Sequence, residues 1–373
     1  LDPPDLNAAQ EWYRKAIEAG NTECMRDLGL LFANQLDPPD LNAAQEWYRK
    51  AIEAGNTECM RDLGILFATL NPPDLDAAQE WFRKAIGAGN TECMRDLGIL
   101  FATQNQPDLD AAQEWYRKAI EAGNTEAMCD LGLLFANQLD PPDLNAAQEW
   151  YRKAIEAGNT EAMCGLGLLF ATQNPPDLDA AQEWYRKAIE AGNTDAMRDL
   201  GLLFANQFDP PDLDAAEEWY RKAIEAGSTD AIANIGDLRS RQGDKAGAVD
   251  AWRRALESPG GSRQSIAAAR FALAALEALD GHKDEARALL DDVEASGFVI
   301  AAHCAALLST HDATRAKARE SLAAHEEDTD ALNFLGLAAR EANDLAAART
   351  YWNQSTAALD TVAPLLLHLT NGD

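Results

Sequence analysis

Residues 22–55 read TECMRDLGLLFANQLDPPDLNAAQEWYRKAIEAG, and the chain repeats this stretch with few changes. The period is 34 or 35 residues, because the copies begin at Thr22, Thr57, Thr91, Thr125, Thr160, Thr194 and Thr229. A fixed period of this length is typical of solenoid proteins, in which each repeat buries its apolar face only against its neighbours. The repetition therefore predicts a solenoid, and the pattern within one copy decides which elements form it.

Two helical patterns lie within one copy. The first helix is predicted over 22–34, where the apolar face consists of Met25, Leu28, Leu31 and Phe32. The second is predicted over 41–54, where the buried face consists of Ala44, Trp47, Tyr48, Ala51 and Ile52. The fold class is therefore all-α, an α-solenoid of stacked antiparallel helix pairs.

Local signals mark the ends of both helices. Asn21 or Thr22 supplies the first N-cap, and Asp40 supplies the second. Pro-Pro at 38–39 interrupts the helical pattern, because proline lacks a backbone donor and disfavours helix at the preceding residue. Gly55 suits the left-handed position that ends the second helix. Each pair is thus a helix, a long turn, a second helix and a short link.

The order of residues in the copy resembles the tetratricopeptide repeat (TPR): Met25-x2-Leu28-Gly29-x2-Phe32, then Ala44-x3-Tyr48-x2-Ala51. The Pro-Pro insertion and the short link between pairs are similar to the Sel1-like subclass. The resemblance covers 1–257. It implies a right-handed superhelix that serves as a scaffold for contacts between proteins.

The organisation along the chain has three sections. Residues 1–21 are interpreted as the second helix of a truncated repeat, which suggests an excerpt from a longer protein. Residues 22–258 form the seven Sel1-like/TPR units, and 259–373 form three divergent TPR-like pairs and a capping helix. The divergent helices are expected at 263–279, 282–296, 299–309, 313–325, 330–341, 345–359 and, as the closing helix, 361–369.

Composition limits the classes of partner. The chain has 62 acidic and 32 basic residues, a formal charge of −30 and a pI near 4.4. Such a surface repels nucleic acid and anionic membranes, so a protein or peptide of basic character is the expected partner. The alternative interpretation is that the acidic residues only keep a long array soluble. No apolar stretch is long enough to cross a membrane.

Residues with catalytic or metal-binding potential follow no known arrangement. The five histidines are His282, His303, His311, His325 and His368, and none has a metal-ligand spacing. No phosphate-binding loop or Ser-His-Asp grouping is recognisable, and the acidic residues recur in every copy. The sequence therefore predicts no enzyme activity, no cofactor and no metal.

The cysteines occupy two repeat positions and one site in the divergent section. Cys24, Cys59 and Cys93 share a position that is alanine in later copies, which indicates a small packing site. Cys129 and Cys164 instead replace the arginine of other copies. Equivalent positions in stacked repeats are too far apart for disulfides. Free thiols predict a reducing compartment, and the cytoplasm is the expected location; the chain does not begin with Met, so a signal peptide stays open.

The resemblance implies that the first helices line a concave groove. Alternate positions along these helices then face a peptide ligand, giving parallel rows of acidic, basic, aliphatic and amide or hydroxyl groups. An alternative is that Glu and Arg three residues apart merely pair within one helix. The candidate partner-binding residues are Glu23, Arg26, Leu30, Asn34, Glu58, Arg61, Ile65, Glu92, Arg95, Ile99, Glu126, Cys129, Leu133, Glu161, Cys164, Leu168, Asp195, Arg198 and Leu202.

Three functions agree with these features. The first is a scaffold whose groove binds a partner protein or peptide. The second is a sensor or regulatory arm of a larger signalling protein whose catalytic domain lies upstream. The third is a structural repeat that self-assembles, because near-identical units can stack end to end. Within the groove, the copies with Cys129 and Cys164 are the expected centre of recognition, since they lack the basic row.

Overall fold

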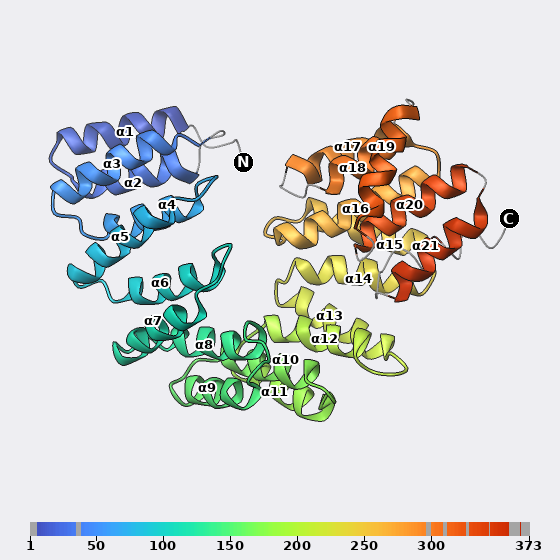
Figure 1. Ribbon diagram of the computed structural model, residues 1–373, viewed down its shortest axis with the longest axis horizontal. Coiled ribbons are helices and arrows are strands. Elements are labelled where there is room, and N and C mark those ends of the chain that lie inside the picture. Colours follow the sequence, from blue (N-terminus) through green and yellow to red (C-terminus); the bar gives the residue numbers. More distant parts are fainter. Residues whose placement is uncertain are drawn as a thin grey trace. The chain divides into compact units, whose positions relative to one another are not determined.

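The computed structural model describes residues 6–34, 39–295, 300–308, 312–325, 328–342, 344–357 and 366. Within those ranges all regular structure is helical, with 21 α-helices in succession (Figure 1). The predicted all-α class is confirmed. The chain divides into two compact units, Leu1–Leu169 and Phe170–Asp373, and the division falls inside α10 (Glu161–Thr172).

The first unit consists of helix pairs in which an even-numbered helix is followed by an odd-numbered one. Helix α1 precedes the first of these pairs. The helices are α1 (Leu6–Glu18), α2 (Glu23–Asn34), α3 (Leu41–Glu53), α4 (Cys59–Thr69), α5 (Leu75–Gly87), α6 (Glu92–Thr103), α7 (Leu109–Glu121), α8 (Glu126–Asn137), α9 (Leu144–Glu156) and the first part of α10.

The second unit continues the pairs and then contains longer and shorter helices. They are α11 (Leu178–Glu190), α12 (Asp195–Asn206), α13 (Leu213–Glu225), α14 (Asp230–Arg241), α15 (Lys245–Glu257), α16 (Arg263–Leu279), α17 (Lys283–Ala295), α18 (Ile300–Leu307), α19 (Asp312–Ala323), α20 (Thr329–Glu341) and α21 (Leu345–Ala357). The closing helix expected over 361–369 lies outside the described residues, apart from Leu366.

The second helix of each pair begins at an aspartate. The Asp40 carboxylate accepts a hydrogen bond from the backbone N–H of Ala43 at 2.9 Å, and the Asp40 N–H donates to the carbonyl of Phe32 at 2.9 Å. One residue thus caps α3 and closes the Pro-Pro turn. The same two bonds form at Asp74, Asp108, Asp143, Asp177 and Asp212.

The other helix ends use asparagine and glycine. Of the two candidates for the first N-cap, Asn21 is the one used: its Oδ1 accepts from the N–H of Glu23 at 3.1 Å. The equivalent Thr91 makes no capping bond through its side chain. Gly55 has a φ of +98°, which a side chain would strain, and it ends α3 as predicted.

The core of each pair depends on the close approach of its helices. A Cβ added to Gly29 would lie 2.6 Å from the ring of Tyr48, so glycine is required where that ring crosses α2. Ala44 and Tyr48 are buried, as predicted. Trp47 and Ile52 are only half-buried, which corrects the prediction for both. The Trp47 ring lies at the edge of the helix pair, where the Lys50 ammonium sits 4.3 Å from its centroid.

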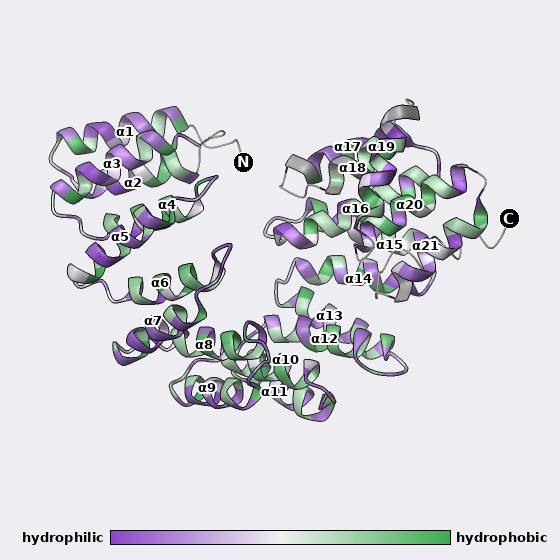
Figure 2. Ribbon diagram, in the orientation of Figure 1, coloured by the Kyte–Doolittle hydropathy of each residue, from purple (hydrophilic) through white to green (hydrophobic). Residues whose placement is uncertain are grey.

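Hydropathy along the ribbons follows this packing. Each repeat helix carries both hydrophobic and hydrophilic residues (Figure 2). In the α14–α15 pair the aromatic residue changes: Trp252 takes the place of the tyrosine, and a Cβ on Gly236 would lie 2.5 Å from its ring. The Trp252 indole N–H donates to Asp237 at 2.9 Å, so the polar group of this larger, fully buried ring has a hydrogen-bond partner.

Candidate partner-binding surface

The candidate residues of the first unit fall into three rows along α2, α4, α6, α8 and α10, here called the first-helix surface. The acidic row is exposed and consists of Glu23, Glu58, Glu92, Glu126 and Glu161. The second row is half-buried and consists of Arg26, Arg61, Arg95, Cys129 and Cys164. The aliphatic row ranges from half-buried to exposed and consists of Leu30, Ile65, Ile99, Leu133 and Leu168. Asn34 is exposed at the end of α2.

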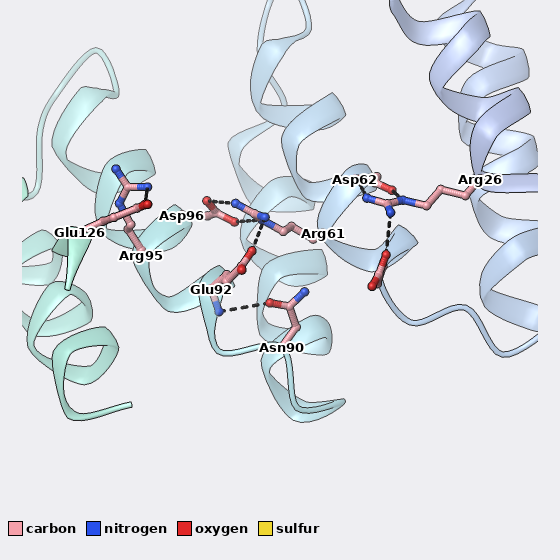
Figure 3. A network of polar contacts seen from close by, with 9 residues as sticks. Arg26, Arg61, Asp62, Asn90, Glu92, Arg95, Asp96 and Glu126 are labelled. Carbon is pink, nitrogen blue, oxygen red and sulfur yellow. Dashed lines mark hydrogen bonds and ion pairs between the residues drawn. The ribbon is translucent and has the colours of Figure 1, made fainter. Parts of the chain in front are cut away.

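The arginines of the second row bind the next repeat. Arg61 donates from Nε to Asp96 Oδ2 at 2.5 Å and from Nη2 to Asp96 Oδ1 at 3.1 Å, while its Nη1 donates to the Glu92 carboxylate. The guanidinium on α4 therefore connects two carboxylates of α6 (Figure 3). This two-point geometry is the strong form of an arginine–carboxylate contact.

Two neighbouring junctions repeat the arrangement. Arg26 binds Glu58 at 2.6 Å and Asp62 at 2.6 and 3.2 Å. Arg95 binds Glu126 at 2.5 Å and also contacts Asp130 through two nitrogens. We call these contacts the arginine clamps. The alternative that Glu and Arg pair within one helix is therefore wrong for these junctions, because each guanidinium reaches across to the following repeat.

Each arginine clamp includes a second, less exposed carboxylate, that of Asp62, Asp96 or Asp130, which the sequence did not predict. The side chain of Asp96 is only 12% exposed, whereas that of Glu92 is 63% exposed. The hydrogen bond to Asp96 is the main cause of the raised pKa of Arg61, which stays charged. Since the arginines are occupied, a ligand can pair with them only by breaking a junction between repeats.

The fourth junction, between α8 and α10, has no clamp. Cys129 stands at the position of Arg26, Arg61 and Arg95, and Gly165 stands at the position of Asp62, Asp96 and Asp130, which those arginines bind. A Cβ on Gly165 would lie 2.6 Å from the ring of Tyr151, so the ring fills the space that an aspartate would need. Glu161 keeps its carboxylate, is exposed, and forms no ion pair with any residue that the structure describes.

Cys129 has no nucleophilic character in this setting. The pKa of its thiol is raised to about 12, first by burial and then by the nearby carboxylates of Asp130, Glu161 and Glu126, while Arg95 lowers it. The thiol is therefore neutral at physiological pH. Cys59 and Cys93 are fully buried, as expected of a small packing position, and none of the six cysteines, all of them among the described residues, forms a disulfide.

The candidates of the second unit differ in their pairing. Arg198 on α12 donates from Nη2 to its own neighbour Asp199 at 2.9 Å and from Nη1 to Asp230 at 3.3 Å. Burial is the main cause of the raised pKa of Asp199, and Arg198 opposes it. Asp195 is exposed and Leu202 is half-buried. The guanidinium is again engaged within the protein.

A pocket opens on the first-helix surface between α4 and α6. It has a volume of about 320 Å³ and a mostly apolar lining. Two predicted residues, Ile65 and Ile99, meet there, together with Ala68, Thr69, Pro73, Leu75, Phe82, Asp96, Leu100, Thr103, Gln104 and Asn105. The sequence did not predict that turn residues line this pocket, because the sequence of one repeat does not show how the turn folds back over the helix.

Within the described ranges no group of three or more His, Cys, Asp or Glu side chains could hold a metal ion. The side chain of His303 lies outside them. No helix of the described part combines the length and apolar character needed to cross a membrane.

Comparison with known proteins gives matches along most of the chain. The Sel1 repeat model matches more than half of it, at residues 2–21, 22–56, 57–90, 91–124, 125–159 and 160–193. The tetratricopeptide repeat model matches 177–231 and 234–297. No curated protein sequence matches the chain.

Similar solved structures include three bacterial proteins. A protective antigen of uropathogenic Escherichia coli with an SLR fold is 21% identical, with a TM-score of 0.45, over 95% of this chain and 80% of that one. A Sel1 repeat protein from Oxalobacter formigenes is 25% identical, with a TM-score of 0.39, over 58% and 99%. An immunity protein of Pseudomonas aeruginosa is 21% identical, with a TM-score of 0.36, over 60% and 84%.

Proposed function

Because the chain belongs to the Sel1 repeat family, we propose that it is a non-enzymatic scaffold that binds a partner protein or peptide on the first-helix surface. The observation that carries this proposal is the pocket of about 320 Å³ between α4 and α6. A mostly apolar pocket of this size, with a few polar groups at its rim, suits a large side chain of a bound peptide. Ile65, 42% exposed, supplies part of its wall.

The charge of the surface supports a basic partner. The acidic row is exposed in every repeat of the first unit, and Arg26, Arg61 and Arg95 of the neighbouring row are bound in the arginine clamps. A cationic segment would find carboxylates at the rim and apolar side chains beside them. Such complementarity mainly raises the association rate and the specificity of binding.

The cytoplasm is the proposed location. The support is chemical: none of the six cysteines, each of them in the described part of the chain, forms a disulfide, and reducing compartments keep cysteines as thiols. The raised pKa of Cys59, Cys93 and Cys129, due first to burial, also keeps them unreactive towards disulfide exchange.

A peptide selection tests the function. A displayed library of random peptides is selected against the immobilised chain, and the recovered peptides are titrated against the Ile65→Asp variant. We expect binding at least about tenfold weaker, because an aspartate in the pocket removes roughly 2 kcal/mol of apolar burial. Leu345→Asp is the matched control, since Leu345 is an aliphatic residue exposed to a similar extent, 47%, on α21.

The control separates the pocket from general effects of charge. Both variants add one negative charge at an exposed aliphatic position, and circular dichroism checks that both remain folded. Peptides that bind Ile65→Asp as tightly as the unchanged chain would contradict the proposal. Peptide binding that is weakened equally by Ile65→Asp and Leu345→Asp would also contradict the proposal.

A further inference from the structure

The fourth junction of the first-helix surface carries a chemistry that the other junctions lack. We propose that the strip formed by Cys129, Leu133, Glu161 and Leu168, here called the clamp-free strip, is the docking position for a partner segment that presents a cationic side chain next to an aliphatic one. This inference rests on the proposed function and specifies both the position on the surface and the chemistry of the partner.

The first observation is the missing cation. At three junctions a guanidinium lies against the acidic row: Arg26 against Glu58, Arg61 against Glu92 and Arg95 against Glu126. At the fourth the neutral Cys129 occupies that repeat position, and the exposed Glu161 pairs with no cation among the described residues. The carboxylate that an arginine would have bound within the chain is thus available to an arginine or lysine of a partner.

The second observation is the exposure of the aliphatic row at the same place. Leu133 and Leu168 are 43% and 49% exposed; among the equivalent residues Ile65 is 42% exposed, and Leu30 and Ile99 are half-buried. An exposed ion pair contributes little affinity by itself, because water screens it. Two exposed leucines beside the carboxylate add apolar area that a partner can bury. The combination distinguishes this strip from the other junctions.

The third observation is that the junction also lacks the second carboxylate of a clamp, because Gly165 stands at the position of Asp62, Asp96 and Asp130. The Tyr151 ring lies against Gly165 so closely that an added Cβ would be 2.6 Å from it. An aspartate at 165 would therefore displace the ring. The junction therefore has neither the arginine nor the aspartate of a clamp, but it keeps the exposed Glu161. The carboxylate of Glu161 gives the strip a net negative charge.

The spacing along α10 defines the partner further. Glu161 and Leu168 lie seven residues apart on one helix face, a separation of about 10 Å. A peptide in the polyproline II conformation presents residues three apart on one side, about 9 Å from each other. The expected segment is therefore extended, with arginine or lysine three positions from leucine or a similar residue.

A designed probe tests this chemistry. The probe is a fluorescein-labelled peptide, Ser-Gly-Arg-Pro-Pro-Leu-Gly-Ser, titrated by fluorescence anisotropy against the full chain. Cys129→Arg should weaken binding at least about tenfold, because the new guanidinium would occupy Glu161 as Arg95 occupies Glu126. Glu161→Gln should weaken it about threefold to fivefold, as expected for one partly exposed ion pair.

Matched controls accompany both variants. Asn42→Arg adds the same charge at an exposed position of the second helix α3, outside the first-helix surface, and should leave the affinity unchanged. Glu53→Gln removes an exposed carboxylate from α3, outside the first-helix surface, and should also leave the affinity unchanged. A probe with glutamate in place of arginine should not bind.

The outcomes separate this inference from the proposed function. If the probe binds but only Ile65→Asp weakens it, the clamp-free strip is not the docking position and the scaffold function stands. If no substitution on the first-helix surface changes the affinity, both proposals fail. If the probe does not bind at all, the inferred partner chemistry is wrong, and the peptide selection decides the function independently.

Discussion

The arginine clamps predict that a single guanidinium stabilises the junction between two repeats. Replacing Arg61 with alanine removes three hydrogen bonds to α6 and leaves Asp96 without its cation. Because repeats in a solenoid contact only their neighbours, the effect should be confined to α4, α6 and the adjoining helices. Unfolding of the distant repeats should remain unchanged.

The magnitude follows from the exposure of the groups. Exposed ion pairs contribute about 0.2–1 kcal/mol, and the contact with Glu92, whose side chain is 63% exposed, belongs to this class. Breaking a fully buried pair costs about 3–5 kcal/mol. The pair with Asp96 lies between the two, since that side chain is 12% exposed and Arg61 is 32% exposed. We therefore expect Arg61→Ala to lower the local free energy of unfolding by about 2 kcal/mol, which corresponds to roughly thirtyfold faster opening.

Hydrogen–deuterium exchange measures this locally. Backbone amides of α4 and α6 should exchange about thirtyfold faster in Arg61→Ala, while those of α1 keep their rates. Arg83→Ala is the control in the same repeat, because Arg83 bonds among the described residues only to Gln79, through an exposed contact within α5. Equal exchange in the two variants would refute the reasoning, since it would mean that the clamp contributes no more than a surface contact.

Three further predictions concern packing, capping and the thiols. Gly98→Ala should lower stability by about 2 kcal/mol in a urea titration, because its Cβ would lie 2.5 Å from the Tyr116 ring; an unchanged midpoint would contradict the required close approach. Asp108→Ala should cost about 1 kcal/mol by losing the cap of α7, whereas Asp108→Asn should retain most of it. Only the thiolate reacts with iodoacetamide, so a pKa of about 12 should make alkylation of Cys129 at pH 8 roughly a thousandfold slower than that of a thiol with a pKa of 9. The alkylation rate should rise about tenfold per pH unit up to pH 12. A rate that levels off near pH 9 would rule out the raised pKa.

The fold was predictable because its signals are local and recur in each copy. Asp40 and Gly55 mark the ends of α3, and both act as their residue types predict. The crossing of Tyr48 over Gly29 likewise follows from the small residue in the first helix. The half-buried Trp47 was not predictable, because helical periodicity gives the direction of a side chain and not how far the neighbouring repeat covers it.

The candidate site was predictable in its rows but not in its pairing. The positions of Arg61 and Ile65 on the first helix follow from one copy, whereas the partner of Arg61 depends on the register between copies. One signal was present: the copy that has Cys129 in place of arginine is followed by the copy that has Gly165 in place of aspartate. That joint change is what a contact between neighbouring repeats would produce.

Site-specific photocrosslinking tests most directly the central claim that partners bind on the first-helix surface. A photoreactive residue is introduced at Ile99, in the pocket between α4 and α6, and in a second variant at Glu114, an exposed position on the second helix α7. Each variant is irradiated with a peptide recovered from the library selection, and the adducts are identified by mass spectrometry. Our account predicts a peptide adduct from position 99 and none from position 114. An adduct from position 114 without one from position 99 would contradict it.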